Sequence, residues 1–376
     1  MRRCKTCVET DTRPTMEFDE DGICLPCRSV SLSANEEIDW DARAAILEDI
    51  IQWGKEHKSS GYDCIIGVSG GKDSTRQALF AKEHGLNPLL VSYNYPPEQQ
   101  TEIGAQNLAN LVELGFDVLR ITPSPFISKA LMKECFYKLG NLFNASELAL
   151  YASLPITAIA YKIPLILLGE NPGLAFGTDV GSKDYNGNQM RKMNTLQGGD
   201  PNRFKTDWMD DKDLYWYRYP LDKDREKADL RIVYLGYFMD DFNDHTNAKY
   251  SIAHGLKIRT GEDADPNNIG GTGTWTALDD DFVIVNQMLK YMKFGFGKAT
   301  QESGVSIRAG LMSREEGMEI VKKYDGKCAP KYIREFCEYI DISEEEFWRV
   351  AESFRDHKFF TKDSKGEWHL KEELLR

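Results

Sequence analysis

Short apolar runs alternate with amphipathic stretches through the first two thirds of the chain. Runs of strand length cover residues 63–68, 88–93, 117–121 and 163–168, and a fifth candidate strand covers 231–235. Between them, apolar residues recur at helical spacing over 74–84, 99–114 and 144–162, and Ser124-Pro125 begins a further helix. This alternation predicts an α/β domain with a parallel five-stranded sheet flanked by helices. Because the strands are apolar throughout, we expect both faces of the sheet to be covered.

Ligands in such sheets bind at the carboxyl ends of the strands. That rule points to residues 69–74, 92–97 and 169–173. An irregular stretch at about 170–230, rich in Gly, Asn, Asp and aromatic residues, interrupts the pattern. Its Trp and Tyr residues at 208–219 argue against disorder, and we expect core packing more than stacking on a sugar or base.

Helices are also predicted before and after the segments that form this sheet. A helical stripe lies within residues 30–60, with Asp39 or Asp41 as its cap. The carboxyl-terminal part contains a predicted helix at 281–294, followed by capping-box patterns at 313–316 and 343–346.

Composition and charge narrow the function classes. Of the 376 residues, 41% are hydrophobic and 28% charged, which is ordinary for a globular protein with a sizeable core. The 60 acidic residues against 47 Lys and Arg give a net charge of −13, which disfavours non-specific nucleic-acid binding. We predict no membrane span, since no apolar run approaches 18 residues, and the amino terminus lacks the apolar region of a signal peptide. The expected location is therefore the cytoplasm.

Four cysteines near the amino terminus form two CxxC pairs. They are Cys4, Cys7, Cys24 and Cys27, with 16 residues between the pairs. This spacing is typical of a tetrahedral zinc site with four thiolates, which leaves no open position for catalysis. A metal would also supply the stability that so short a segment lacks. Free cysteines or a redox pair are the alternatives.

These features predict three regions. Residues 1–30 form a zinc ribbon, 31–240 the α/β domain with the irregular insertion at about 170–230, and 241–376 a mainly helical region.

The first strand continues into a loop with the sequence SGGKDS, residues 69–74. Its glycines let the backbone approach an anion, and the N–H groups at the start of the next helix point at that anion. The hydroxyls and Lys72 add donors and a positive charge. The loop matches neither the Walker A nor the dinucleotide-binding pattern. A polar turn that merely caps the helix is the alternative.

This loop resembles the SGGxDS signature of the PP-loop (N-type) ATP pyrophosphatases, and the resemblance implies a HUP-like sheet. It also implies that ATP is cleaved between its α and β phosphates, that a substrate carbonyl is adenylated, and that a nucleophile then displaces AMP. It assigns catalysis to Ser69, Lys72 and Asp73. The implied ATP-binding residues are Val68, Ser69, Gly70, Gly71, Lys72, Asp73, Ser74, Ser92, Gly169 and Glu170. Glu170 would bind Mg²⁺, which prefers hard oxygen ligands, although a plain surface carboxylate is an equal alternative.

Further runs resemble a narrower family. The cysteine pairs, residues 101–107, 234–238 and 291–297, Arg308 and residues 313–317 together resemble the N-acetyl sugar amidotransferases of bacterial O-antigen and related surface-glycan synthesis. The resemblance extends from Cys4 to about Tyr324. It implies that the acetamido group of a nucleotide-linked sugar is activated with ATP, and that ammonia replaces AMP to give an acetamidino group.

The source of the ammonia is expected to be a separate protein. None of Cys64, Cys135, Cys328 and Cys337 lies in a nucleophile elbow, and residue 2 is Arg. The resemblance implies a two-part glutaminase and barrel partner similar to those of histidine biosynthesis.

The sugar pocket is predicted from cationic residues. Arg191, Lys192, Lys293 and Arg308 could bind phosphate or carboxylate groups, and exposure on a solvated surface is the alternative for each.

Two other functions compete with this interpretation. A tRNA thiolase shares the loop and often carries CxxC pairs, but it would need a basic surface and a catalytic cysteine, for which Cys135 is the conceivable candidate. A nucleotide-binding scaffold without turnover is the other.

Overall fold

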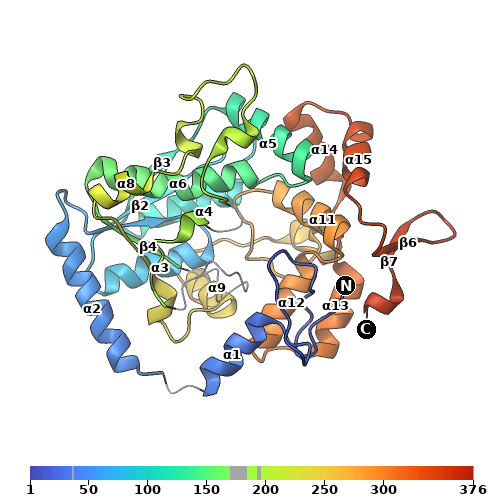
Figure 1. Ribbon diagram of the computed structural model, residues 1–376, viewed down its shortest axis with the longest axis horizontal. Coiled ribbons are helices and arrows are strands. Elements are labelled where there is room, and N and C mark those ends of the chain that lie inside the picture. Colours follow the sequence, from blue (N-terminus) through green and yellow to red (C-terminus); the bar gives the residue numbers. More distant parts are fainter. Residues whose placement is uncertain (36–37, 170–183, 193–195, 376) are drawn as a thin grey trace.

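The core of the protein is a five-stranded parallel sheet. The structure, a computed structural model, describes residues 1–35, 38–169, 184–192 and 196–375 (Figure 1). Within these residues the sheet order is β3-β2-β1-β4-β5. The strands are β1 (Cys64–Gly67), β2 (Pro88–Tyr93), β3 (Asp117–Ile121), β4 (Leu165–Leu168) and β5 (Arg231–Tyr234). This confirms the predicted α/β class, including the fifth strand.

The order of the strands places the loop after β1 at the centre of the sheet. β1 pairs with β2 on one side and with β4 on the other, with Ile65 opposite both Leu89 and Ile166. The chain thus leaves β1 for β2 in one direction and later returns to β4 on the opposite side. Such a switch point opens a crevice at the carboxyl ends of the strands.

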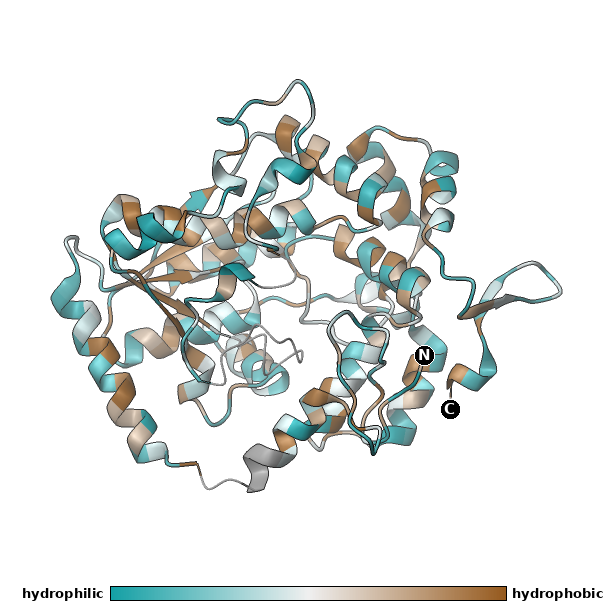
Figure 2. Ribbon diagram, viewed as in Figure 1, coloured by the Kyte–Doolittle hydropathy of each residue, from teal (hydrophilic) through white to brown (hydrophobic). Residues whose placement is uncertain are grey.

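Helices cover both faces of the sheet, as the apolar strands require. One face packs against α2 (Trp40–His57), α3 (Lys72–Glu83) and α4 (Glu102–Glu113). The other packs against α6 (Asn144–Tyr161), whose Leu154 and Ala158 meet Ile65 and Ile166. Figure 2 shows the brown, hydrophobic strands enclosed by helices with teal outer faces.

The described residues of the irregular stretch after β4 include several short helical elements. These are η1 (Met190–Lys192), η2 (Pro201–Phe204), η3 (Tyr215–Tyr217) and α8 (Asp222–Lys227). Tyr217 and Tyr219 are buried against α5 (Pro125–Leu139) and α6, whereas Trp208 and Tyr215 are exposed. Core packing therefore accounts for only part of this aromatic group.

Helices make up most of the chain beyond β5. They are η4 (Leu235–Phe238), α9 (Asp244–Ala253), η5 (Gly261–Ala264), α10 (Pro266–Ile269), α11 (Phe282–Phe294), α12 (Lys298–Arg308), α13 (Arg314–Tyr324), α14 (Pro330–Ile340) and α15 (Glu344–Ser353). A hairpin of β6 (Phe360–Lys362) and β7 (Trp368–Leu370) follows, and then η6 (Glu372–Leu375). α11, α14 and α15 share a hydrophobic cluster with α5, so this region packs directly on the sheet domain.

The amino-terminal cysteine module, residues 1–30, packs on the far end of the chain. Two isolated bridges, Arg3 with Thr10 and Phe18 with Cys24, shape it, and α1 (Leu25–Asn35) begins within it. Arg314 Nε of α13 donates to the carbonyl oxygens of Cys4 and Cys7, at 3.2 and 3.1 Å. Figure 1 shows this dark blue segment beside α12 and α13.

Among the residues with a described position, no helix combines the length and apolar character needed to cross a membrane.

Candidate functional site

The loop between β1 and α3 has the geometry of an anion site. Gly70 has φ of +80°, and a Cβ there would lie 3.0 Å from the backbone nitrogen of Leu108 in α4, so glycine is required. Gly71 is the N-cap of α3 and makes no side-chain capping bond. The N–H groups of the first turn therefore remain available, at the positive end of a helix dipole. Such a helix start binds phosphate readily.

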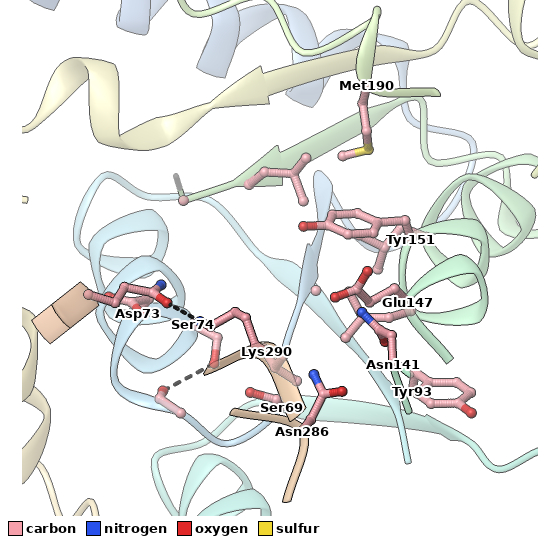
Figure 3. A pocket seen from close by; sticks show the side chains of 18 of the residues that line it. Ser69, Asp73, Ser74, Tyr93, Asn141, Glu147, Tyr151, Met190, Asn286 and Lys290 are labelled. Atoms are coloured by element: carbon pink, nitrogen blue, oxygen red, sulfur yellow. Dashed lines mark hydrogen bonds between the residues drawn. The ribbon is translucent and has the colours of Figure 1, made fainter. Parts of the chain in front are cut away.

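This loop lines a cavity of about 570 Å³ at the carboxyl ends of the strands. Three separate parts of the chain form the wall: the sheet domain, the α11–α12 region and residues 13–14 of the cysteine module. The polar residues that line it are Arg13, Ser69, Asp73, Ser74, Gln77, Tyr93, Asn141, Glu147, Tyr151, Tyr234, Asn286, Lys290, Lys293 and Gln301. In Figure 3, Ser69, Asp73 and Ser74 lie on one side, and Asn141, Glu147 and Tyr151 on the other.

Two lysines of α11 bring positive charge to the cavity. Lys290 Nζ donates to Gln301 Oε1 at 3.0 Å, and burial followed by the charge of Arg13 lowers the pKa of Lys290 to about 7. Lys293 donates to the carbonyl oxygen of Leu139, and burial lowers its pKa as well. A bound polyphosphate would favour the protonated forms of both lysines.

Lys72 occupies a different position from the one its role in the loop motif suggests. It is buried and is not among the cavity-lining residues of the described chain. Its Nζ contacts Asp73 Oδ2 at 2.6 Å and Asp244 Oδ1 at 2.8 Å. Burial alone would lower the pKa of Lys72, but Asp73 and Asp244 raise it above its ordinary value, so the lysine stays charged.

Helix α9 holds the start of α3 through these contacts. Asn247 Nδ2 donates to Asp73 Oδ1 at 2.8 Å, and Ser251 Oγ donates to the carbonyl oxygen of Lys72 at 2.7 Å. Asp244 also accepts a bond from Trp275 Nε1 at 2.7 Å. The carboxylate of Asp73 is thereby fixed in orientation at the edge of the cavity.

The predicted nucleotide-binding residues mostly meet at this cavity. Val68, Ser69, Gly71, Asp73, Ser74 and Gly169 line it, and Gly70 shapes the turn. Ser92 is buried and donates to Asn94 Oδ1 at 2.6 Å, while its neighbours Val91 and Tyr93 form the wall. Glu170, the predicted Mg²⁺ ligand, lies outside the described residues.

The predicted sugar-binding residues do not meet at one place. Lys293 lines the cavity. Arg191 bonds the carbonyl oxygen of Gly198 and Asp222, and Lys192 is exposed. Arg308 points at the cysteine cluster, with Nη1 3.7 Å from Cys7 Sγ. Of the four, only Lys293 lines the cavity that contains residues of the 69–74 loop.

Several cavity residues escaped prediction from the sequence. Lys290 directly precedes the 291–297 run, so that run pointed to the right place without naming it. Arg13, Asn141, Glu147 and Asn286 stand in no motif, and only the fold brings them to the cavity.

The four amino-terminal cysteines are buried together and fit a structural metal. Cys4 Sγ lies 3.9 Å from Cys27 Sγ, and Cys7 Sγ lies 3.6 Å from Cys24 Sγ. All four sulfurs lie within 4.8 Å of one another. A tetrahedron with Zn–S bonds of about 2.3 Å has sulfur–sulfur edges of about 3.8 Å, so the cluster is compatible with zinc. Backbone N–H groups of Cys7, Glu9 and Cys24 approach the sulfurs, as thiolates require.

Comparison with known proteins gives two kinds of match. Residues 272–375 match the family model of the LPS biosynthesis protein WbpG-like, C-terminal domain. Over 85 residues, the chain is 31% identical to 7-cyano-7-deazaguanine synthases of two Helicobacter pylori strains, 26695 and J99. These matches cover 22% of this chain and 36% of each relative, so the chain spans about a third of the length of these curated relatives.

The matched carboxyl-terminal domain takes a direct part in the cavity. It supplies Asn286, Lys290, Lys293, Phe294, Phe296 and Gln301. The wall opposite residues 69–74 therefore lies within the region that matches this family model.

Proposed function

Because this chain belongs to the PP-loop superfamily and ends in a WbpG-like domain of lipopolysaccharide biosynthesis, we propose that it is an ATP-dependent amidotransferase of surface-glycan biosynthesis. Its substrate is a nucleotide-linked N-acetyl sugar, and its product carries an acetamidino group. The observation that supports this most is the shared cavity, in which the SGGKDS loop and the WbpG-like wall enclose one space. A cavity of about 570 Å³ is of the size that ligand sites have.

The loop binds the phosphates of ATP in this proposal. The free N–H groups at the start of α3 and the hydroxyls of Ser69 and Ser74 face the β and γ phosphates. Lys290 and Lys293 approach from α11 and offset charge on the departing pyrophosphate. Lys72 does not contact the phosphates in this proposal and acts indirectly, because its ion pairs with Asp73 and Asp244 hold Asp73 in place.

Magnesium fits the same place. Asp73 offers a hard carboxylate at the edge of the cavity, and Glu170 follows the cavity-lining Gly169 in the sequence. Bound Mg²⁺ would neutralise phosphate charge as the α–β bond breaks.

The acetamido carbonyl is a poor electrophile, and in the proposed reaction adenylation of its oxygen makes it reactive. The acetamido oxygen attacks the α-phosphorus, pyrophosphate leaves, and the oxygen becomes part of a phosphate leaving group. Ammonia then adds to the carbon, and AMP departs with the former amide oxygen. No covalent enzyme intermediate is required, which agrees with a cavity whose described lining contains no cysteine.

The thiolase alternative has little support in the geometry. Cys135, its candidate nucleophile, is fully buried in α5, and burial raises its pKa to about 12. A thiol in that state is a weak nucleophile.

The test is a panel of UDP- and CMP-linked acetamido sugars incubated with ATP, Mg²⁺ and ammonium. The expected products are AMP, pyrophosphate and a sugar in which one oxygen has been replaced by NH, as read by mass spectrometry. Formation of ADP, or AMP release that no sugar stimulates, would refute the proposal.

We also propose that a separate glutaminase with a barrel-type partner supplies the ammonia. The purified chain should then use ammonium but not glutamine. Full turnover with glutamine and the single chain would contradict this.

A further inference from the structure

Glu147 stands apart from every role assigned so far. It lies in the first turn of α6 and lines the cavity from the side opposite the nucleotide loop (Figure 3). Its Oε2 is shielded from solvent and has no hydrogen-bond partner among the residues the structure describes. A buried acceptor without a donor is costly and rare in native proteins. Its presence in the substrate cavity suggests that a ligand completes it.

The surroundings of Glu147 leave its carboxylate available. Arg203 of η2 acts on it through charge, and Arg203 Nη2 donates to Asn144 Oδ1 at 2.9 Å. Asn141 and Asn286 use their side-chain oxygens to accept backbone N–H bonds from Phe143 and Leu142, at 2.8 and 2.9 Å. Their NH₂ groups therefore remain to donate to a substrate oxygen on this side of the cavity.

A purely structural role accounts poorly for this residue. A carboxylate in the first turn of a helix is favoured by the helix dipole. However, the N-cap of α6, Phe143, makes no side-chain capping bond, and in the described chain Glu147 Oε2 caps no backbone N–H group.

We propose that Glu147 is the catalytic base that takes a proton from the nitrogen nucleophile in the second half-reaction. This inference rests on the function proposed above. Ammonia adds to the carbon of the protonated adenylated amide, forming a C–N bond and a tetrahedral species with an ammonio group. Glu147 accepts one proton from that group. The neutral amine then pushes out AMP, whose oxygen takes the electron pair of the breaking C–O bond, and the product is the amidinium. The proton leaves Glu147 for solvent after product release.

The titration of Glu147 suits this task. Burial raises its pKa to about 7, and Arg203 opposes the shift. A base with a pKa near the working pH combines a sufficient ionised fraction with a useful proton affinity. Besides Arg203, the titratable groups around it are Cys135 of α5, Tyr95 after β2, and the cavity's own Asp73, Tyr93, Tyr151, Tyr234, Arg13, Lys290 and Lys293.

The experiment separates the two half-reactions in Glu147→Gln. Pyrophosphate release in the first turnover reports adenylation, and amidine formation reports attack by ammonia. We expect the first to stay within a few fold of wild type and the second to fall by about 100-fold or more. The acidic limb of the kcat profile near pH 7 should disappear. Hydroxylamine, which is uncharged at neutral pH and loses its proton readily after attack, should restore much of the rate.

Two controls make the result decisive. Glu113→Gln, an exposed change on α4, should alter neither half-reaction. If Glu147→Gln does not fold, Glu147→Asp keeps a carboxyl group and should show a lower kcat with the acidic limb retained; an unchanged kcat would overturn the proposal. Equal loss of both half-reactions, or an acidic limb that persists in Glu147→Gln, would also overturn it. Absence of sugar-dependent pyrophosphate release in wild type would instead refute the proposed function itself.

Discussion

Replacing Gly70 with alanine tests the geometry of the nucleotide loop most directly. The residue has φ of +80°, and an added Cβ would lie 3.0 Å from Leu108 N and 3.1 Å from Asn107 Cβ. Both neighbours belong to α4 and have no rotamer that moves them away. The substitution therefore combines backbone strain with a steric clash against a helix.

The magnitude follows from these two contributions. The left-handed conformation costs an alanine about 1–2 kcal/mol. Overpacking against a rigid neighbour costs about 1–3 kcal/mol more. Reduced freedom of the unfolded chain returns about 0.4–1 kcal/mol. We expect Gly70→Ala to lower the free energy of unfolding by about 1–4.6 kcal/mol and to abolish ATP binding at millimolar nucleotide.

Two other glycines separate the contributions. Gly366 has φ of +81° in the β6–β7 turn, and a Cβ there would meet no atom within 4 Å, so Gly366→Ala measures the strain alone. Gly71 has φ of −85°, and the nearest atom to its added Cβ is the mobile Ser69 Oγ at 3.2 Å. Gly71→Ala should therefore change stability by less than about 1 kcal/mol, yet weaken ATP binding, because its methyl group enters the cavity wall.

The assays are urea unfolding followed by circular dichroism and calorimetric titration with ATP and Mg²⁺. Equal losses of stability in Gly70→Ala and Gly366→Ala would show that α4 yields to the new methyl group. ATP binding that survives in Gly70→Ala with unchanged affinity would refute the assignment of the loop as the phosphate site.

Three further predictions concern charges and the metal. Cys24→Ser, or a strong chelator, should lower the melting temperature and weaken sugar binding together, because the module carries cavity residues; intact sugar binding after metal loss would separate the two. Lys72→Met should lower the free energy of unfolding, measured with urea, by about 3–5 kcal/mol, because it leaves Asp244 without its ion-pair partner. The double variant with Asp244→Asn should lose less than the sum of the two single losses. Additive losses would contradict a coupled pair. Burial lowers the pKa of Lys290 to about 7, so between pH 7 and about 10 the unfolded chain binds more protons than the folded chain. The free energy of unfolding should therefore rise with pH over this range. Lys290→Met should flatten that rise, and thermal melts at several pH values would show the change.

Patterns of residues that are close together in the sequence predicted turns and helix caps. The loop, its strand and its helix are contiguous, so their pattern predicted a glycine at a left-handed position, which Gly70 confirms. The anion site that the same pattern predicts stays a prediction. The Ser313 capping box is formed as predicted, and Asp39 caps α2 by accepting from Ala42 N. The predicted single helical stretch at 30–60 is two helices, since α1 begins at Leu25 and carries Cys27. α1 begins at Leu25 because Cys27 must lie in the cysteine cluster, and hydrophobic periodicity contains no information about that requirement.

Contacts between distant residues decided what the sequence left open. Lys72 stands in the motif as a mobile charge, yet Asp244 binds it from a helix that the sequence places 172 residues away. Arg308 was expected at the substrate and instead faces Cys7, because α12 packs on the cysteine module. Glu147 has no motif, since its significance comes from burial without a partner. Each of these depends on packing between elements, which a periodic pattern along one element does not encode.

The distribution of the cavity wall suggests how one fold serves different substrates. The loop that we propose to hold phosphate lies inside the sheet domain, where local sequence fixes its conformation. The opposite wall comes from α11 and α12 in the WbpG-like domain and from Arg13 and Pro14 of the cysteine module. Arg13 pairs with Glu9 and lies over the ring of Phe296, so the module and that domain support each other at the cavity. We expect specificity to change through these outer walls while the proposed phosphate site is preserved, because a site can vary on a conserved fold.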